Sequence, residues 1–354
     1  MREWESNIRK VTPYVPGEQP KRADVIKLNT NENPYPPSPK VAEVLRQIGT
    51  EPMRKYPDPE ARMLVEAIAH EEGVSPAQVF VGVGSDDVLA MIFLTFFNSQ
   101  KPVFFPDITY SFYDVWADML RIPYEQQPLN EAFEIVARDY DKENGGVIFP
   151  NPNAPTGSLL GLDVIEDILN RNQDVIVVVD EAYIDFGGKT CTGLLARYEN
   201  LIVVKTFSKS RSLAGMRIGY AIASEELIRY LNDVKYSFNS YTMNQTAILL
   251  GTAAAEDHAY FEETRAKIIA TRENAKTELK KLGFSFADSQ ANFLFATHER
   301  IPAAELFAVL KEQGIYVRYF NKPRIDNYLR ITIGTDEEME RLYEFLREYV
   351  VTRE

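Results

Sequence analysis

Short apolar runs alternate with segments of helical periodicity from about Val79 onward, and this alternation constrains the fold more than any other feature. The runs cover residues 79–81, 103–105, 147–149, 175–179, 201–204 and 220–222. Between them, apolar residues recur at helical spacing over residues 85–97, 162–171 and 225–234. Continuous apolar strands are typical of a parallel sheet that helices bury on both faces. The pattern therefore predicts an α/β fold with a largely parallel central sheet.

The last part of the chain has fewer apolar runs. A long helical stretch, interrupted near residues 252–258, runs to Leu282; strands are then expected at 293–295 and 328–333, before a closing helix at 336–349. The proline-rich residues 13–39 cannot form a regular helix or a central strand. A chain of 354 residues exceeds the usual size of one hydrophobic core, and an apolar content of 45% suffices for two. We therefore expect an N-terminal arm, a large α/β domain and a smaller α+β domain, over residues 1–30, 31–240 and 241–354.

The charge and the rarity of cysteine and histidine exclude several classes of protein. A formal net charge of −13 argues against a nucleic-acid or anionic-membrane surface, because such surfaces need clustered lysine and arginine. Cys191 is the one cysteine, and the three histidines, His70, His258 and His298, show no ligand spacing. No apolar run reaches membrane-spanning length. We therefore expect a cytoplasmic protein without a disulfide, a metal site, or a nucleic-acid or membrane partner.

Polar residues with specific chemistry follow three of the predicted strands. Asp180 ends one apolar run, Ser208 and Lys209 follow another, and the triplet Gly84-Ser85-Asp86 closes a third and opens a helix. Ligands of open α/β folds bind beyond the carboxyl ends of the strands. A serine–lysine pair in a loop, or an aspartate before a helix, is common when taken alone. Their coincidence at one edge of the sheet predicts a ligand site.

These residue types suit pyridoxal 5'-phosphate, a cofactor with an aldehyde, a phosphate and a ring nitrogen. The amine of Lys209 would hold the aldehyde and later move the proton of the reacting carbon. Asp180 would pair with the protonated ring nitrogen, which keeps the ring an electron sink. Ser208, the guanidinium of Arg217 and the amides of residues 84–86 would hold the phosphate. The sequence therefore predicts catalysis with this cofactor.

Two tyrosines follow strands near the same edge. Tyr110 is placed to stack on the cofactor ring, although an aromatic residue in such a position is more often part of the core. Tyr183, three residues after Asp180, is placed to donate a hydrogen bond to the phenolic oxygen of the cofactor; otherwise it would be a buried tyrosine with a backbone partner. Both are predicted to bind the cofactor, and Tyr183 to act with Lys209 and Asp180 in catalysis.

Longer motifs carry a resemblance to a known family. The chain contains Pro-Thr-Gly at residues 155–157, Asp-Glu-Ala-Tyr at 180–183, and Ser208-Lys209 followed by Gly-Met-Arg-Ile-Gly at 215–219. Over essentially its whole length it resembles the fold-type-I aminotransferases, which use pyridoxal 5'-phosphate. That resemblance implies a large domain with a mainly parallel, seven-stranded sheet between helices, and a smaller α+β domain beside it.

Within this family, other segments resemble the histidinol-phosphate aminotransferases. They are Thr-Pro-Tyr at residues 12–14, Leu-Asn-Thr-Asn-Glu-Asn-Pro at 28–34, Tyr-Pro-Asp-Pro at 56–59 and Leu-Arg-Ile-Thr-Ile-Gly at 329–334. The resemblance implies reversible transfer of an amino group between L-histidinol phosphate and 2-oxoglutarate, in histidine biosynthesis. Alternatives are an aromatic amino acid aminotransferase, a threonine-phosphate decarboxylase and a non-catalytic regulator that binds the cofactor.

The resemblance also assigns residues outside the cofactor motifs. It implies a homodimer, in which the N-terminal arm joins the small domain and the dimer contact. Tyr56 would reach the cofactor phosphate of the other subunit. Tyr14, Asn31, Arg318 and Arg330 would bind the substrate, and the two arginines would hold its phosphate with their planar donors.

One position departs from the family pattern. The family usually has an asparagine directly before Pro-Thr-Gly, and its amide contacts the phenolic oxygen of the cofactor. This chain has Ala154 there, and Asn153 lies one residue earlier. Either the turn directs Asn153 toward the ring, or Tyr183 alone makes that hydrogen bond.

Overall fold

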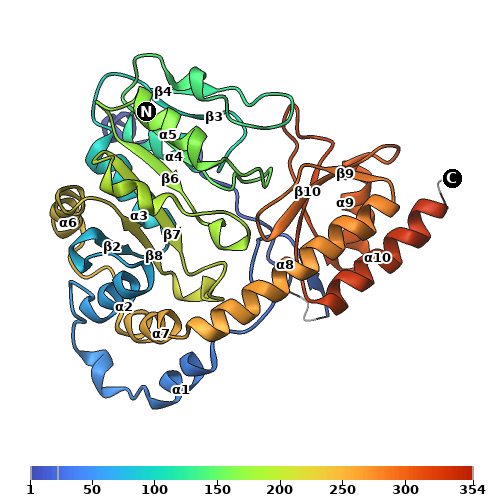
Figure 1. The fold of residues 1–354 in the computed structure, drawn as a ribbon, viewed down its shortest axis with the longest axis horizontal. Helices are drawn as coiled ribbons and strands as arrows, with labels where there is room; N and C mark the ends of the chain where they lie inside the picture. Colours follow the sequence, from blue (N-terminus) through green and yellow to red (C-terminus); the bar gives the residue numbers. More distant parts are fainter. Residues whose placement is uncertain (1, 22–23, 353–354) are drawn as a thin grey trace.

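The computed structural model describes residues 2–21 and 24–352, and a seven-stranded sheet forms its centre (Figure 1). The strands are β2 (Val79–Gly82), β3 (Val103–Pro106), β4 (Tyr124–Gln127), β5 (Gly146–Pro150), β6 (Val177–Asp180), β7 (Leu201–Thr206) and β8 (Gly219–Ile222). Across the sheet they follow the order β2-β8-β7-β6-β5-β3-β4. Strand β8 runs antiparallel to both neighbours, and the other pairs are parallel. The predicted α/β fold with a largely parallel sheet is confirmed.

The strands form where the apolar runs predict them, with two differences. Every residue of β2, β3, β5, β6, β7 and β8 is buried, as expected for strands covered on both faces. The sequence does not predict β4, because Tyr124-Glu125-Gln126-Gln127 forms no apolar run, and this strand lies at the sheet edge with three of its residues exposed. Strand β6 begins at Val177 rather than Val175, because the Val175 N–H donates to the Asn172 carbonyl in a turn.

Helices surround the sheet (Figure 1). The α-helices of the described residues are α1 (Pro39–Gln47), α2 (Arg62–Glu72), α3 (Ser85–Phe96), α4 (Tyr113–Leu120), α5 (Leu162–Arg171), α6 (Glu225–Phe238), α7 (Gln245–Ala255), α8 (His258–Lys281), α9 (Ala303–Glu312) and α10 (Asp336–Val351). Short 3-10 helices are η1 (Glu3–Asn7), η2 (Glu51–Arg54), η3 (Pro76–Gln78), η4 (Ala137–Tyr140), η5 (Ile184–Phe186), η6 (Cys191–Ala196) and η7 (Ala214–Met216). The predicted interruption of the long helical stretch is confirmed, because α7 ends at Ala255 and α8 begins at His258.

Each apolar run supplies two layers of core, because successive strand residues point to opposite faces. Helices α3, α4 and α6 pack on one face, against side chains that include Val178 and Ile202. Helix α5 packs on the other face, against Val177 and Val203. Helices α1, α2 and α7 pack beside β2 and β8. The helices leave the carboxyl edge of the sheet to loops, as the predicted ligand site requires.

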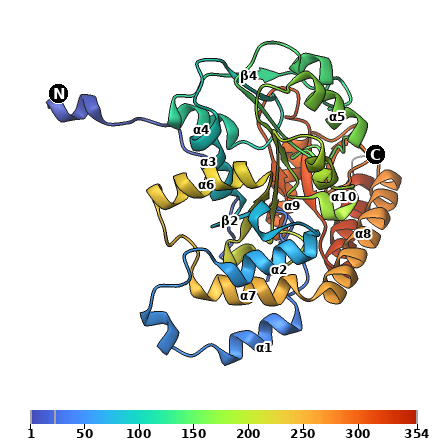
Figure 2. The same ribbon diagram turned by 60° about the vertical axis from the view of Figure 1, so that its left-hand side comes forward.

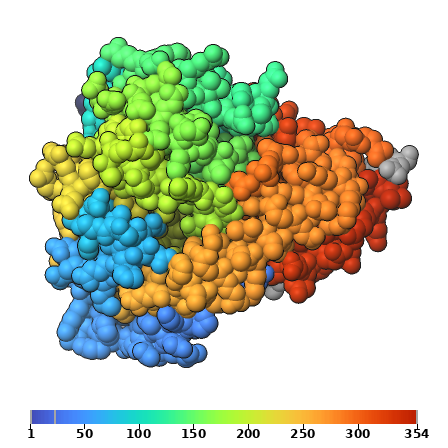
Figure 3. Space-filling view, viewed as in Figure 1, coloured from blue at the N-terminus to red at the C-terminus, as the bar shows by residue number. Residues whose placement is uncertain are grey.

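A smaller sheet of four antiparallel strands lies beside the large one. Its strands are β9 (Phe284–Phe286), β10 (Phe293–His298), β12 (Arg318–Tyr319) and β13 (Leu329–Thr332), in the order β12-β13-β10-β9. Helices α8, α9 and α10 share one core with it. In the space-filling view these residues form a smaller lobe, coloured orange to red (Figure 3). The predicted smaller α+β domain is confirmed.

The N-terminal residues connect to the small domain through a separate two-stranded sheet. Helix η1 extends away from the body of the molecule (Figure 2). Farther along, the two-residue strand β1 (Ile26–Lys27) pairs in parallel with β11 (Ile315–Tyr316). The predicted lack of regular structure over residues 13–39 holds for the described residues up to Ser38, which contain neither a helix nor a central strand; Pro39 differs, because it is the first residue of α1, where a proline is tolerated. No helix in the ranges 2–21 and 24–352 combines the length and apolarity that crossing a membrane requires.

Candidate active site

The predicted site residues surround a cavity of about 150 Å³ at the carboxyl edge of the large sheet. The N-terminal segment, the loops after β3, β6 and β7, and the small sheet all contribute to its lining. The predicted residues that line it are Tyr14, Asn31, Tyr110, Tyr183, Lys209, Arg318 and Arg330. Segments far apart in the sequence therefore meet at one place.

Lys209 is the basic group of this cavity. It follows β7, and its Nζ donates to the Thr30 carbonyl at 3.1 Å. Burial, together with the positive charge of Arg330, lowers the pKa of the Lys209 amine to about 8. An appreciable fraction of this amine is therefore neutral near pH 7, as a nucleophile and base requires.

Asp180 is a buried carboxylate at the last position of β6. The Tyr113 hydroxyl donates to its Oδ2 at 3.0 Å, and the Ala182 N–H donates to its Oδ1 at 3.2 Å. Within the described ranges no lysine or arginine forms an ion pair with it, and burial raises the pKa of this carboxyl to about 6. The Asp180 carboxylate therefore has no cationic partner. A protonated ring nitrogen would be such a partner. Sequence reasoning missed Tyr113, which reads as an ordinary core residue of α4.

A second group of residues forms a cradle for an anion at the start of α3. Gly84 has a φ of 83°, and a Cβ there would lie 2.5 Å from Nη2 of Arg217. The Arg217 Nη1 donates to the Ser208 hydroxyl at 3.4 Å. A Cβ on Gly219 would lie 2.2 Å from the Ser85 backbone nitrogen. The two glycines therefore let free helix amides, a hydroxyl and a guanidinium approach one another, which suits a phosphate.

Asp86 has a different place in this cradle from Gly84 and Ser85. Its Oδ2 pairs with Nη2 of Arg217 at 3.0 Å, and its Oδ1 accepts from the Tyr110 hydroxyl at 2.6 Å. A carboxylate repels a phosphate, so Asp86 could contribute only its backbone N–H to anion binding. Its side chain instead links Arg217 to Tyr110, which lines the cavity.

In the turn around Ala154, the side chain of the neighbouring Asn153 is hydrogen-bonded to other protein groups. Asn153 is buried, and its Nδ2 donates to the Ile108 carbonyl and to the Thr156 hydroxyl, both at 3.0 Å. Ala154 lines the cavity, whereas Asn153 is not among the lining residues. Tyr183 lines the cavity as well, and its hydroxyl accepts a hydrogen bond from Asn31 Nδ2 at 2.9 Å.

The two arginines of the small sheet line the cavity where this sheet borders it. Arg330 donates through Nη2 to the Asn29 carbonyl at 3.0 Å, while its Nε is buried without a partner. Arg318 donates to the backbone carbonyls of Val15 at 3.2 Å and Pro16 at 3.4 Å. Tyr14, from the same arm segment, stacks on Phe112 with ring centroids 4.2 Å apart. The arm thus covers this side of the cavity.

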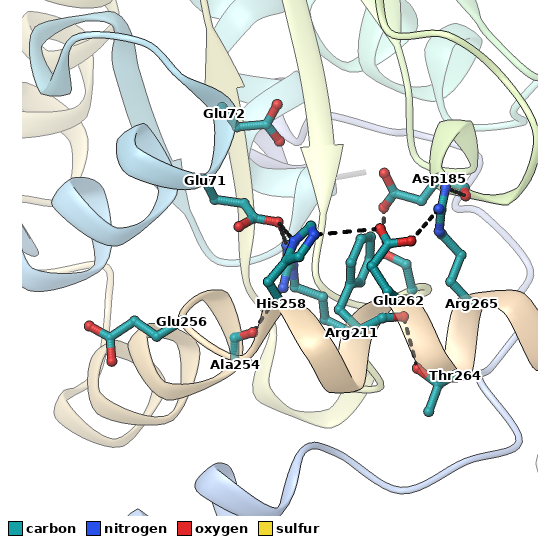
Figure 4. A network of polar contacts seen from close by, with 12 residues as sticks. Glu71, Glu72, Asp185, Arg211, Ala254, Glu256, His258, Glu262, Thr264 and Arg265 are labelled. Carbon is teal, nitrogen blue, oxygen red and sulfur yellow. Dashed lines mark hydrogen bonds and ion pairs between the residues drawn. The ribbon is translucent and has the colours of Figure 1, made fainter.

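A network of charged groups supports the loop that carries Lys209 (Figure 4). Arg211 pairs with Glu71 of α2 at 2.8 Å and donates to the Ala254 carbonyl at the end of α7, also at 2.8 Å. His258, at the start of α8, contacts the same Glu71 oxygen at 3.1 Å. The network ties the Lys209 loop to the junction between α7 and α8. The sequence contains no local motif that would indicate it.

Tyr56 lies outside the cavity of its own chain. Its side chain is 82% exposed and stacks on Tyr241 with ring centroids 4.6 Å apart. Other large apolar side chains are exposed in the same part of the sequence or next to Tyr241, namely Met53, Tyr236 and Phe238.

The described residues fit pyridoxal 5'-phosphate, the cofactor that the resemblance implies. Lys209 gives the cavity an amine with a lowered pKa. Asp180 and the cradle at Gly84 are not among the lining residues; they add a buried carboxylate without a cationic partner and an anion site where a Cβ on Gly84 would crowd the Arg217 guanidinium. These groups match the aldehyde, the ring nitrogen and the phosphate of the cofactor in turn. Each of the three groups therefore has a counterpart in that ligand.

Comparisons with known proteins agree with this chemistry. Residues 23–346 match the family model described as aminotransferase class I and II. The chain is similar to a histidinol-phosphate aminotransferase of Lactococcus lactis subsp. cremoris, at 51% identity over 351 residues and 99% of both chains. It is similar to that of Acinetobacter baumannii at 52% identity over 354 residues, covering 99% of this chain and 98% of that protein. Among solved structures, the histidinol-phosphate aminotransferase of Sinorhizobium meliloti in complex with pyridoxal-5'-phosphate matches with a TM-score of 0.87 at 24% identity, over 97% of this chain and 96% of that chain.

Proposed function

The chain belongs to the aminotransferase class I and II family, whose members work with pyridoxal 5'-phosphate, and from this premise we propose that it is a histidinol-phosphate aminotransferase. The proposed reaction is the reversible transfer of an amino group between L-histidinol phosphate and 2-oxoglutarate. The observation that carries the proposal is the meeting of a lysine of lowered pKa with two arginines at one cavity.

Lys209 and Asp180 would be the main catalytic residues. The bound cofactor supplies an aldehyde for the amine and an electron sink for the reacting carbon. Lys209 would hold the aldehyde and, because its pKa is about 8, take the proton from the substrate α-carbon and deliver it to the former aldehyde carbon of the cofactor. Asp180 would hold the ring nitrogen, and Tyr113 would fix the direction of its carboxylate. Transfer through a covalently held group predicts ping-pong kinetics.

The other predicted cofactor residues would hold the two ends of the ring. Ser208, Arg217 and the amides of Ser85 and Asp86 would bind the phosphate, whereas the Gly84 N–H donates to the Gly82 carbonyl at 2.9 Å and Gly84 would contribute close backbone approach. Tyr110 would lie against the ring and Tyr183 would donate to its phenolic oxygen. Asn153 is left out of the proposed site, because its amide nitrogen donates to the Ile108 carbonyl and to the Thr156 hydroxyl.

Arg318 and Arg330 would bind the phosphate of histidinol phosphate, with Tyr14 closing the cavity above them. The unpartnered Nε of Arg330 favours an anionic ligand, because a buried donor without an acceptor is costly. Arg318 now donates to arm carbonyls, so a bound phosphate would replace those contacts. A planar guanidinium binds a phosphate through two parallel hydrogen bonds.

Steady-state kinetics with several amino donors would test this proposal. We expect histidinol phosphate to exceed phenylalanine in kcat/KM by at least about tenfold. Arg318→Gln should lower kcat/KM for histidinol phosphate and leave that for phenylalanine nearly unchanged, because phenylalanine has no phosphate. Equal or reversed preference would point to an aromatic amino acid aminotransferase. Release of carbon dioxide from threonine phosphate would indicate a decarboxylase. A cofactor absorbance band without any amine transfer would indicate a regulator.

The active unit would be a homodimer in the cytoplasm. The exposed, stacked pair of Tyr56 and Tyr241 supports a contact with a second copy, because large exposed aromatic side chains that pack together are typical of interaction surfaces. Tyr56 would reach the cofactor phosphate of that copy. The one cysteine, Cys191, is buried and free, which agrees with a reducing compartment.

A further inference from the structure

The Tyr183 hydroxyl receives a hydrogen bond from a residue 152 positions away in the chain. Asn31 Nδ2 donates to it at 2.9 Å, and both side chains are buried. A tyrosine hydroxyl has one hydrogen to donate. No acceptor for that hydrogen is found in the part of the chain that the structure describes. Because Tyr183 lines the cavity, its hydrogen is available to a bound ligand.

Every polar group of Asn31 has a partner, and apart from Tyr183 the partners belong to the small domain. The Asn31 backbone N–H donates to the Thr332 hydroxyl at 3.0 Å, and that hydroxyl donates to Asn31 Oδ1 at 3.1 Å. Asn292, just before β10, donates to the Asn31 carbonyl at 3.1 Å. The three contacts leave the Asn31 amide nitrogen directed at Tyr183.

The backbone of Asn31 is adapted to this arrangement. Its φ of 57° lies in the left-handed region, which asparagine and glycine tolerate better than other residues. Asn31 is only 1% exposed and Thr332 only 2%, so water does not compete for these bonds. The side chain is therefore held in one orientation from two sides.

We propose that Asn31 is a positioning residue that directs the Tyr183 hydroxyl toward the phenolic oxygen of the cofactor, and that Thr332 of the small sheet holds Asn31 for this purpose. The Tyr183 oxygen accepts its hydrogen bond from the Asn31 amide, so the hydroxyl hydrogen of Tyr183 is left to point into the cavity. This inference rests on the proposed function. It also revises the predicted substrate role of Asn31, because the contacts of its amide are to Tyr183 and Thr332.

The same arrangement accounts for Ala154. In the turn before Pro-Thr-Gly the chain has no amide that faces the cavity, since Asn153 donates to Ile108 and Thr156. Tyr183 then remains as the donor to the phenolic oxygen, and its orientation becomes more important. An asparagine from the N-terminal segment supplies that orientation.

The visible absorbance of the bound cofactor, followed against pH, would test the inference. A hydrogen bond donated to the phenolic oxygen stabilises the phenolate anion. The phenolate then attracts the proton on the nitrogen next to it less strongly, and the pKa of that proton falls. Tyr183→Phe should therefore raise the pH midpoint of the absorbance change. Asn31→Gly, which keeps the left-handed backbone, should raise it in the same direction by about half a pH unit, the effect of a weak hydrogen bond. The charged groups that act on the Tyr183 hydroxyl, Arg330, Lys209, Asp180 and Asp86, are unchanged in these variants.

A double variant and a matched pair of Thr332 variants distinguish a positioning role of Asn31 from a general loss of protein stability. In the Tyr183→Phe background, Asn31→Gly should produce no further shift, because the group it orients is gone. Thr332→Val removes the hydroxyl and should raise the midpoint, whereas Thr332→Ser retains the hydroxyl and should leave it near the wild-type value.

Two results would overturn the inference. One is an unchanged midpoint in both Asn31→Gly and Thr332→Val, with a lower melting temperature alone. The other is an undiminished shift in the double variant, which would mean that Asn31 acts independently of Tyr183. If wild-type protein mixed with pyridoxal 5'-phosphate forms no absorbance band that depends on Lys209, the proposed function itself fails and this inference fails with it.

Discussion

At the scale of single residues, Asp180 is expected to destabilise the protein without cofactor and to stabilise it with cofactor. Burial raises its folded-state pKa to about 6, above the ordinary value of an aspartate. Between the two pKa values the folded chain binds more protons than the unfolded chain, so this contribution to stability falls as the pH rises through that window. Above pH 6 the carboxylate is charged, buried and without a cation. A bound ring nitrogen that carries a proton would supply the cation.

Asp180→Asn should therefore change stability in opposite directions in the two forms. Without cofactor, the variant should have a higher unfolding free energy than wild type, and the difference should increase from about pH 5 to about pH 7.5. The reason is that the wild-type carboxyl becomes charged over this range, whereas asparagine is never charged. With cofactor, the variant should be less stable than wild type, and kcat should fall by about 100-fold or more. Urea denaturation of both forms at the two pH values, with steady-state rates, would measure this. An effect of the Asp180→Asn substitution that is independent of pH in the cofactor-free protein would contradict the assigned pKa.

The sequence predicts some of these residues and not others for a physical reason. Asp180 and Lys209 are predictable because parallel strands end at the same edge, so position along the chain determines position in space. Tyr113, 67 residues before Asp180, and Asn31, 152 residues before Tyr183, meet their partners only after folding. Neither contact leaves a local pattern. The contacts that orient these side chains are made with residues far away in the sequence.

At the scale of elements, Arg211 is the connection between the Lys209 loop and three helices (Figure 4). It is largely buried, pairs with Glu71, donates to the last turn of α7 and lies 4.2 Å from the centre of the Phe261 ring of α8. Removing one partner of a buried pair leaves the other charge uncompensated. The loop and the junction of α7 with α8 should therefore lose stability together.

Arg211→Met should lower the unfolding free energy by about 3 kcal/mol. Arg211→Lys should lower it less, because an ammonium keeps the charge but cannot reach Glu71 and Ala254 with a planar fork. Arg229→Met is a suitable control, since Arg229 forms an exposed pair with Glu226 on α6 and should change stability by about 0.5 kcal/mol or less. Equal effects of the Arg211 and Arg229 variants in chemical denaturation would refute the assignment.

The elements themselves are predictable where burial dictates the residue pattern. Strands β2, β3, β5, β6, β7 and β8 are covered on both faces, so each contains a continuous apolar run that is easy to recognise; the polar residues Asp180, Lys205 and Thr206 stand at the ends of β6 and β7. Strand β4 has one covered end and three exposed residues, and the two-residue strands β11 and β12 are too short for any period to show. Edge and short strands are defined by their hydrogen-bonding neighbours rather than by their own composition.

At the scale of the whole molecule, the phosphate end of the cavity is where a second copy is proposed to contribute Tyr56. Within its own chain Tyr56 contacts Tyr241 and is mostly exposed. A tyrosine that donates to a phosphate forms a hydrogen bond with a charged group, and such bonds are stronger than neutral ones. Tyr56→Phe should therefore weaken cofactor binding by about tenfold or more, measured by absorbance titration of cofactor-free protein.

Mixing two inactive kinds of subunit tests whether Tyr56 acts across the dimer. One kind carries Lys209→Ala and the other Tyr56→Ala, and activity is measured at a cofactor concentration too low to saturate the Tyr56 variant. In a mixed dimer, the site with Lys209 receives Tyr56 from the other subunit and is intact. Random exchange makes about half of the dimers mixed, each with one intact site, so about a quarter of the wild-type activity should return. If Tyr56 served the cavity of its own chain, every Lys209 site would still lack it, and mixing would restore nothing.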